Sequence, residues 1–124
     1  IDPWNELERA KEKDENLTDY IGRCLMRVKM FARETGCTMF MVAHPTKASV
    51  GREVGLWDIE GSMHWMNKCD NGLIVKREKG SKEAIVVSAK VRESPEAGQI
   101  GHCIFLVDPM TGIFHEQQGG GQAL

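Results

Sequence analysis

Apolar positions recur at steps of three and four residues in the first third of the chain, which predicts an amphipathic helix. The pattern begins after Asn16 and continues for about five turns, with charged residues mostly on the other side. Asn16 or Thr18 can cap the start of this helix, and Gly36 can take the left-handed conformation that ends it. The apolar side is formed by Leu17, Tyr20, Ile21, Cys24, Leu25, Val28, Phe31 and Ala32.

Residues 38–43 are apolar or β-branched without polar alternation, which is typical of a strand covered on both faces in a parallel sheet. His44 follows directly, at the carboxyl end of this predicted strand, where open α/β sheets bind their ligands. The alternative is that His44 caps a core strand with a satisfied hydrogen bond. A polar, glycine-rich loop over residues 45–56 comes next, and it is either a plain surface loop or a functional one.

The second half of the chain predicts a short helix followed by β-strands. The helix is expected over residues 58–68, and its buried side would carry Ile59, Met63, Trp65 and Met66. Segments rich in β-branched residues and bounded by turns predict strands over 72–77, 84–90 and 102–107, and a hairpin ending in a strand over 113–115. Residues 117–124 predict a flexible tail, so one domain is expected over residues 1–116.

Composition narrows the classes of partner. Sixteen Lys and Arg against eighteen Asp and Glu give a net charge of -2, which excludes a general basic field for nucleic acid. The four cysteines lack C-x-x-C spacing and the four histidines lack H-x-x-x-H spacing, which favours a reduced cytoplasmic protein without a zinc site. No apolar run approaches the roughly 20 residues that span a bilayer, so no membrane partner is expected. The charged stretch 6–15 is expected to be a solvated helix face or a mobile loop.

Two short stretches carry residue types suited to phosphate chemistry. Asp2 follows an isoleucine at a predicted strand end, where a carboxylate can hold Mg²⁺; the alternative is a helix N-cap. Lys90 and Arg92 stand two apart at a strand end and therefore point to one face, where a phosphate could lie between them. The alternative is two solvated cations, with Glu93 close enough to pair. No segment matches the phosphate-binding G-x-x-x-x-G-K-[ST] motif.

Four motifs, in order, resemble the C-terminal half of the RecA-like motor domain of hexameric replicative helicases. The resemblance covers residues 1 to about 116 and is strongest to the phage primase-helicases and their mitochondrial relative Twinkle, and weaker to the DnaB group. The motifs are Ile1-Asp2, Ala43-His44-Pro45-Thr46-Lys47, Glu60-Gly61-Ser62 with Asn67 and Asp70, and Lys90-Val91-Arg92.

This resemblance implies a role for each motif at a nucleotide site shared between subunits. Asp2 corresponds to the end of the Walker B strand and would orient Mg²⁺, and His44 would sense the γ-phosphate of ATP or another NTP. Asn67 stands where the family has glutamine. Lys90 and Arg92 would reach into the site of the adjacent subunit, with Arg92 as an arginine finger acting in trans.

The resemblance also implies contacts to the base and to DNA. Arg77 and Phe105 would pack against the nucleotide base. Lys47 and Arg52 lie in the loop that resembles the DNA-binding loop facing the central channel, where they would contact the phosphates of single-stranded DNA.

The expected fold is therefore α/β, a partial RecA-like (P-loop NTPase) core with parallel strands and a covering helix, extended by antiparallel strands and a C-terminal hairpin. The expected function is ATP-dependent 5′ to 3′ DNA unwinding by a homo-oligomeric, hexameric ring, in a bacterial or phage-infected cytoplasm. The family's Walker A loop precedes Walker B, where this chain begins, so the chain alone is expected to be inactive. The alternatives are a non-catalytic RecA-like module that binds nucleic acid or a partner, and a recombinase-type ATPase.

Overall fold

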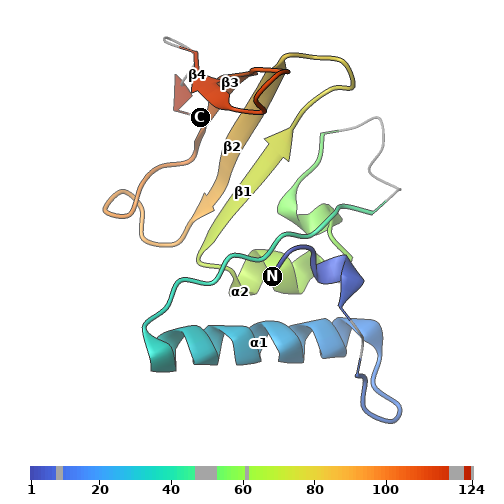
Figure 1. Cartoon of the computed structure of the whole chain (residues 1–124). Helices are drawn as coiled ribbons and strands as arrows, with labels where there is room; N and C mark the ends of the chain where they lie inside the picture. Colours follow the sequence, from blue (N-terminus) through green and yellow to red (C-terminus); the bar gives the residue numbers. More distant parts are fainter. Residues whose placement is uncertain (8–9, 47–52, 61, 118–121, 124) are drawn as a thin grey trace. The chain divides into compact units, whose positions relative to one another are not determined.

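The computed structural model describes residues 1–7, 10–46, 53–60, 62–117 and 122–123 (Figure 1). The chain forms two compact units, Ile1–Cys69 and Asp70–Leu124, and each is described by itself. The first contains two α-helices and the second an antiparallel sheet, so the chain combines helices and strands as predicted. The domain limit expected at residue 116 stays a prediction.

Helix α1, Leu17–Thr35, confirms the helix predicted from the apolar period. Asn16 caps its start, because the Asn16 side-chain oxygen accepts a hydrogen bond of 2.9 Å from the Asp19 N–H. Gly36 ends the helix in the left-handed conformation, with a φ of 69°, as the sequence predicted.

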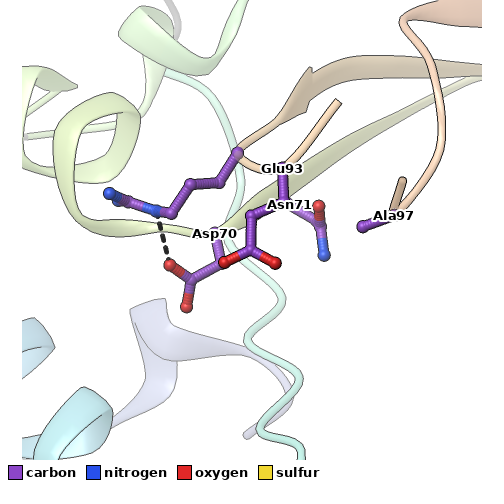
Figure 2. A pocket seen from close by; sticks show the side chains of 5 residues that line it. Asp70, Asn71, Glu93 and Ala97 are labelled. Carbon is purple, nitrogen blue, oxygen red and sulfur yellow. Dashed lines mark ion pairs between the residues drawn. The ribbon is translucent and has the colours of Figure 1, made fainter. Parts of the chain in front are cut away.

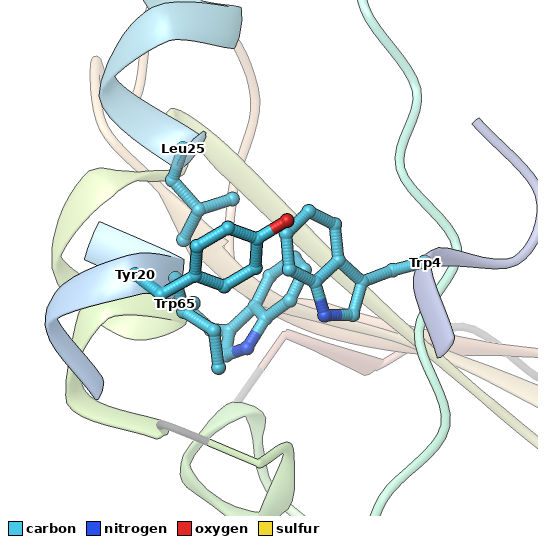
Figure 3. Packing of buried hydrophobic residues seen from close by; sticks show 5 residues of the cluster. Trp4, Tyr20, Leu25 and Trp65 are labelled. Atoms are coloured by element: carbon cyan, nitrogen blue, oxygen red, sulfur yellow. The ribbon is translucent and has the colours of Figure 1, made fainter. Parts of the chain in front are cut away.

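The core of the first unit is largely aromatic (Figure 3). Trp4, from a 3-10 turn over Trp4–Glu6, lies edge-on to Trp65 with ring centroids 5.5 Å apart, and 6.2 Å from the ring of Tyr20. Trp65 belongs to helix α2, Ser62–Lys68, and its indole N–H donates to the Glu60 carbonyl at 2.8 Å. The buried members of this core are Trp4, Tyr20, Ile21, Leu25 and Trp65.

The helix predicted over residues 58–68 is shorter in the structure. A separate 3-10 turn covers Leu56–Asp58, and α2 begins only at Ser62. Trp65 and Ile59 pack in the core as predicted, but Met63 is 62% exposed. Residues two apart in a helix point in different directions, so Met63 cannot lie on the same side of α2 as the buried Trp65.

The strand predicted over residues 38–43 is wrong in its secondary structure and in its burial. These residues are extended but form no regular strand. They pair with the first residues of the chain: the Ile1 nitrogen donates to the Phe40 carbonyl at 2.8 Å, and the Val42 N–H donates to the Ile1 carbonyl at 2.9 Å. This is the bond pattern of a parallel pair, although the sheet of the second unit is entirely antiparallel.

Burial along the same segment alternates, whereas cover on both faces was predicted. Met41 and Ala43 pack against the aromatic core, but Phe40 is 74% exposed and Val42 is also exposed. The reason is that the described part of this unit supplies a packing layer on one side only. A RecA-like core stays a prediction.

The second unit is a sheet in which neighbouring strands run antiparallel, in the order β1-β2-β3-β4, with β5 also paired to β3 (Figure 1). The strands are β1 Asn71–Lys76, β2 Glu83–Val91, β3 Gly101–Val107, β4 Phe114–Glu116 and β5 Gln122–Ala123. The predicted strands and C-terminal hairpin are confirmed to within about one residue. Residues 122 and 123, which were predicted to lie in a flexible tail, pair with β3, because main-chain hydrogen bonds need no apolar side chains.

An ion pair attaches the segment before α1 to the helix. Arg23 Nε and Nη2 donate to the two carboxylate oxygens of Glu15 at 2.8 and 2.7 Å, and the Arg23 guanidinium lies over the Tyr20 ring. Only 11% of the Glu15 side chain is exposed, so the C-terminal end of the stretch 6–15 is not solvated as predicted. The hydrogen bond from Arg23 lowers the pKa of Glu15 from 4.5 to about 2.

This pair predicts an acid-sensitive contribution to stability. The unfolded state takes up the Glu15 proton near pH 4.5 and the folded state only near pH 2, so the contribution is complete above about pH 4.5. It is lost as the pH falls from there toward 2. We expect the difference in free energy of unfolding between wild type and Glu15→Gln to shrink across this window, as measured by urea denaturation.

Glu12→Gln is the matched control, since Glu12 is 69% exposed and its carboxylate lies 3.6 Å from Arg23 Nε. Its difference from wild type should stay nearly constant over the same window. A difference for Glu15→Gln that does not change between neutral and acidic pH would contradict the prediction.

Candidate functional site

The structure distributes the predicted site residues over both units. Asp2, His44 and Asn67 belong to the first unit, and Arg77, Lys90, Arg92 and Phe105 belong to the second. Lys47 and Arg52 lie outside the described residues.

Asp2 and His44 lie on neighbouring extended segments. The pairing of Ile1 with residues 40–42 continues through the Trp4 N–H, which donates to the Val42 carbonyl at 2.7 Å. The His44 N–H then donates to the Asn5 side-chain oxygen at 2.9 Å. His44 is exposed, so it is not a core histidine, and Asp2 is also exposed.

The helix N-cap proposed as the alternative role of Asp2 is not found. Pro3 occupies the capping position of the Trp4–Glu6 turn, and no side chain caps it. An exposed carboxylate fits Mg²⁺, which keeps several waters and takes one or two protein carboxylates together with phosphate oxygens. Among the described residues, no three His, Cys, Asp or Glu side chains gather as a metal site. Asn67 is exposed on α2.

A buried aspartate, Asp58, contacts both ends of the segment that contains Lys47 and Arg52, one end through its main chain and the other through its side chain. The Thr46 N–H donates to the Asp58 carbonyl at 2.7 Å, and the buried Gly55 N–H donates to the Asp58 carboxylate at 2.7 Å. Asp58 itself is 4% exposed. Asp58 was not predicted as a site residue from the sequence, although a capping residue three positions before an acidic one is a recognised signal for such a contact.

The register at the end of β2 determines how Lys90 and Arg92 are presented. Lys90 lies opposite Gly72, and the Arg92 N–H extends the pairing by donating to the Asp70 carbonyl at 2.9 Å. Arg92 therefore stands opposite Asp70, two positions beyond Lys90, and both cations lie on the same side of the sheet.

Asp70 is the acidic partner of Arg92. Arg92 Nε lies 2.6 Å from Asp70 Oδ1, and the two side chains are 44% and 56% exposed (Figure 2). The sequence predicted Glu93 as the nearby carboxylate and placed Asp70 only within a motif. The signal for this pair is register: Asp70 precedes β1 by one residue, and Arg92 follows β2 by one.

A pocket of about 150 Å³ lies beside this ion pair, lined by Asp70, Asn71, Arg92, Glu93 and Ala97 (Figure 2). Ligand pockets usually measure roughly 300–1,000 Å³, so this one is too small for a nucleotide. Its two carboxylates against one guanidinium also disfavour a phosphate inside it. The pocket is therefore not a complete nucleotide site.

Arg77 and Phe105 lie on either side of β2 in the second unit. Lys76 pairs with Ile85, and Phe105 pairs with Ala84, so Arg77 and Phe105 stand at the same level, roughly two strand spacings or 10 Å apart. Arg77 Nε donates to the Ser81 carbonyl at 3.0 Å, which closes the β1–β2 turn. The ring of Phe105 lies edge-on to that of Phe114 with centroids 6.3 Å apart.

Nearly the whole chain is similar to a Twinkle homolog. The relative is the Twinkle homolog protein, chloroplastic/mitochondrial, of Arabidopsis thaliana, with 34% identity over 122 residues. The match covers 94% of this chain but 17% of the Twinkle homolog protein, so the chain spans about a sixth of the length of that relative. No family model matches the chain, and no solved structure matches it. The similarity supports the Twinkle part of the resemblance; the phage and DnaB parts stay predictions.

No described helix is long and apolar enough to cross a membrane.

Asp58 gives a test of how the loop ends are held. Asp58→Ala leaves the buried Gly55 N–H without its acceptor, and an unsatisfied buried donor costs about 1–3 kcal/mol. We expect the free energy of unfolding, measured by urea denaturation, to fall by about that amount. Asp58→Asn keeps an oxygen that can accept from Gly55 and should lose clearly less. Equal stability of wild type and Asp58→Ala would show that this carboxylate does not hold the loop ends.

Proposed function

We propose that this chain is part of an ATP-dependent replicative DNA helicase that unwinds DNA in the 5′ to 3′ direction as a homo-oligomeric, hexameric ring. The observation that carries the proposal is the 34% identity to the Twinkle homolog protein, which extends over 94% of the chain. The order of the four helicase-like motifs supports it. The proposed location is the cytoplasm of a bacterial or phage-infected cell. Activity is assigned to the longer protein, since this chain carries no phosphate-binding G-x-x-x-x-G-K-[ST] motif.

In this proposal, the first unit contributes the residues that face the metal and the γ-phosphate. Asp2 binds Mg²⁺, and His44 contacts the γ-phosphate, a division of roles supported by their exposure on neighbouring segments. Asn67, on α2, contacts phosphate or couples the site to DNA. The bound ion would neutralise charge that develops on the phosphates during transfer.

The second unit contributes the cations that act on the neighbouring subunit's nucleotide. Lys90 and Arg92 share a side of the sheet, which suits two groups that approach one triphosphate. An arginine finger raises phosphoryl transfer by about 10³- to 10⁵-fold, or roughly 4–7 kcal/mol. This gain is a sufficient reason to keep a pair of cations at the end of a strand.

Contacts to the base and to DNA complete the proposal. Arg77 and Phe105 pack against the base, and Lys47 and Arg52 contact single-stranded DNA in the channel. A ring needs only a few basic residues per subunit to surround its channel, which is compatible with a net charge of -2.

The second candidate is a RecA-like module that binds nucleic acid or a partner without turnover. The ion pair between Arg92 and Asp70 is compatible with this candidate too, because the contact occupies the Arg92 guanidinium within its own unit. A recombinase-type ATPase remains the third candidate.

Arg92→Ala in the full-length protein decides between these candidates. We expect DNA-stimulated ATP hydrolysis to fall by about 10³-fold or more, while ring assembly measured by light scattering is unchanged. Arg33→Ala is the matched control, because Arg33 is exposed in the last turn of α1. Unchanged turnover in Arg92→Ala would reject the finger, whereas a wild-type protein without DNA-stimulated hydrolysis would favour the non-catalytic module.

The DNA contacts are tested by the salt dependence of binding. The combined variant Lys47→Ala with Arg52→Ala should bind single-stranded DNA more weakly. The slope of log affinity against log salt should become shallower by about 1.4, since each lost phosphate contact contributes about 0.7. Lys11→Ala with Lys13→Ala is the control, because both lysines are exposed and the proposal assigns neither of them a contact to DNA. A slope equal to that of wild type would contradict the assignment of DNA phosphate contacts to Lys47 and Arg52.

A further inference from the structure

We propose that Asp70 is a positioning residue that holds the guanidinium of Arg92 in the orientation with which it acts on the neighbouring nucleotide. This inference rests on the proposed function. It concerns the acidic residue that the register of β1 and β2 places opposite the finger, for which the sequence analysis gave no role.

Asp70 contacts Arg92 at both ends of the arginine. The Asp70 carbonyl accepts the Arg92 N–H at 2.9 Å, which fixes the main chain where the turn begins. The Asp70 carboxylate lies 2.6 Å from Arg92 Nε, which fixes the far end of the side chain. Nε belongs to the planar guanidinium group, so a bond there sets the plane of that group. One residue thus determines both where the side chain starts and how its charged end is turned.

Stability alone is a weak reason for this pair. Both side chains are about half exposed, and exposed ion pairs contribute little to folding. The main-chain bond already closes this end of the sheet, and it persists whatever side chain residue 70 carries. The carboxylate therefore adds orientation. A long, flexible arginine gains most from a fixed partner, since a misplacement of about 1 Å in a reacting complex can cost about a hundredfold in rate.

The chemistry of the partner also favours aspartate over the nearby Glu93. The bond from Nε to a carboxylate is charge-assisted and stronger than a bond to a neutral acceptor. Glu93 lines the same pocket but is the next residue in the turn after Arg92, whereas Asp70 stands directly across the strand pair. The opposite position is the one from which a short side chain reaches the guanidinium.

The test uses the full-length protein and DNA-stimulated ATP hydrolysis. Asp70→Ala should lower kcat by about ten- to a hundredfold and leave the KM for ATP within about twofold of wild type, because the finger is misplaced but still present. Asp70→Asn, which keeps the shape and an acceptor oxygen, should lose less. Glu96→Ala is the matched control, since it removes an exposed carboxylate of the same turn and should behave as wild type.

A double-variant cycle separates positioning from a general structural effect. Once Arg92 is alanine, Asp70→Ala should cause no further loss of kcat, since there is no finger to hold. An equal loss in both backgrounds would overturn the positioning role. So would an Asp70→Ala enzyme with unchanged or raised kcat, because the carboxylate would then be idle or in competition with phosphate.

Those outcomes leave the proposed function intact as long as Arg92→Ala itself lowers turnover by about 10³-fold or more. If Arg92→Ala leaves turnover unchanged, the finger assignment fails and the positioning role is overturned with it. The two failures are therefore told apart by the single variant Arg92→Ala.

Discussion

The need of main-chain N–H and C=O groups to pair, more than side-chain burial, determines where the candidate functional residues of this chain lie. In the first unit, the Val42 carbonyl accepts a hydrogen bond from the Trp4 N–H, and the Asp58 carbonyl accepts one from the Thr46 N–H. These bonds fix the segments around His44. In the second unit, the pairing of β1 with β2 fixes Lys90 and Arg92. Aromatic packing of Trp4 also stabilises the first unit, but it affects the position of His44 only through the segment that is hydrogen-bonded to Trp4.

The exposed candidate functional residues of each unit are polar side chains carried by paired main chain. Asp2, His44 and Arg92 are all exposed, and the pocket beside Arg92 is too small for a nucleotide. Under the proposed function, a bound nucleotide and a second subunit would complete the surroundings of these side chains. Asp70 fits this arrangement, because a carboxylate beside an exposed arginine limits the orientations that the arginine must lose on binding.

Local patterns predicted the elements well, and long-range partners were not predictable. The limits of α1 followed from Asn16 and Gly36, since caps act within a few residues. The burial of residues 38–43 was predicted wrongly, because an apolar run shows that a segment can be buried but does not show whether one or both of its faces are covered. The contacts of Asp58 and Asp70 depend on which segments pair, and pairing across many residues leaves only a faint trace in one sequence.

The register shift between Gly72 and Leu73 has a consequence for reading related sequences. Leu73 pairs with Ser88 and Gly72 with Lys90, so Ala89 is an extra residue in β2. Counting in twos from Ser88 would assign Lys90 to the wrong side, because the alternation restarts after Ala89. Deleting Ala89 would remove the bulge and leave Lys90 opposite Gly72, so Lys90 and Arg92 would keep the side of the sheet that they have now. The bulge therefore absorbs one extra residue in β2 without changing which side of the sheet the chain's two candidate catalytic cations face.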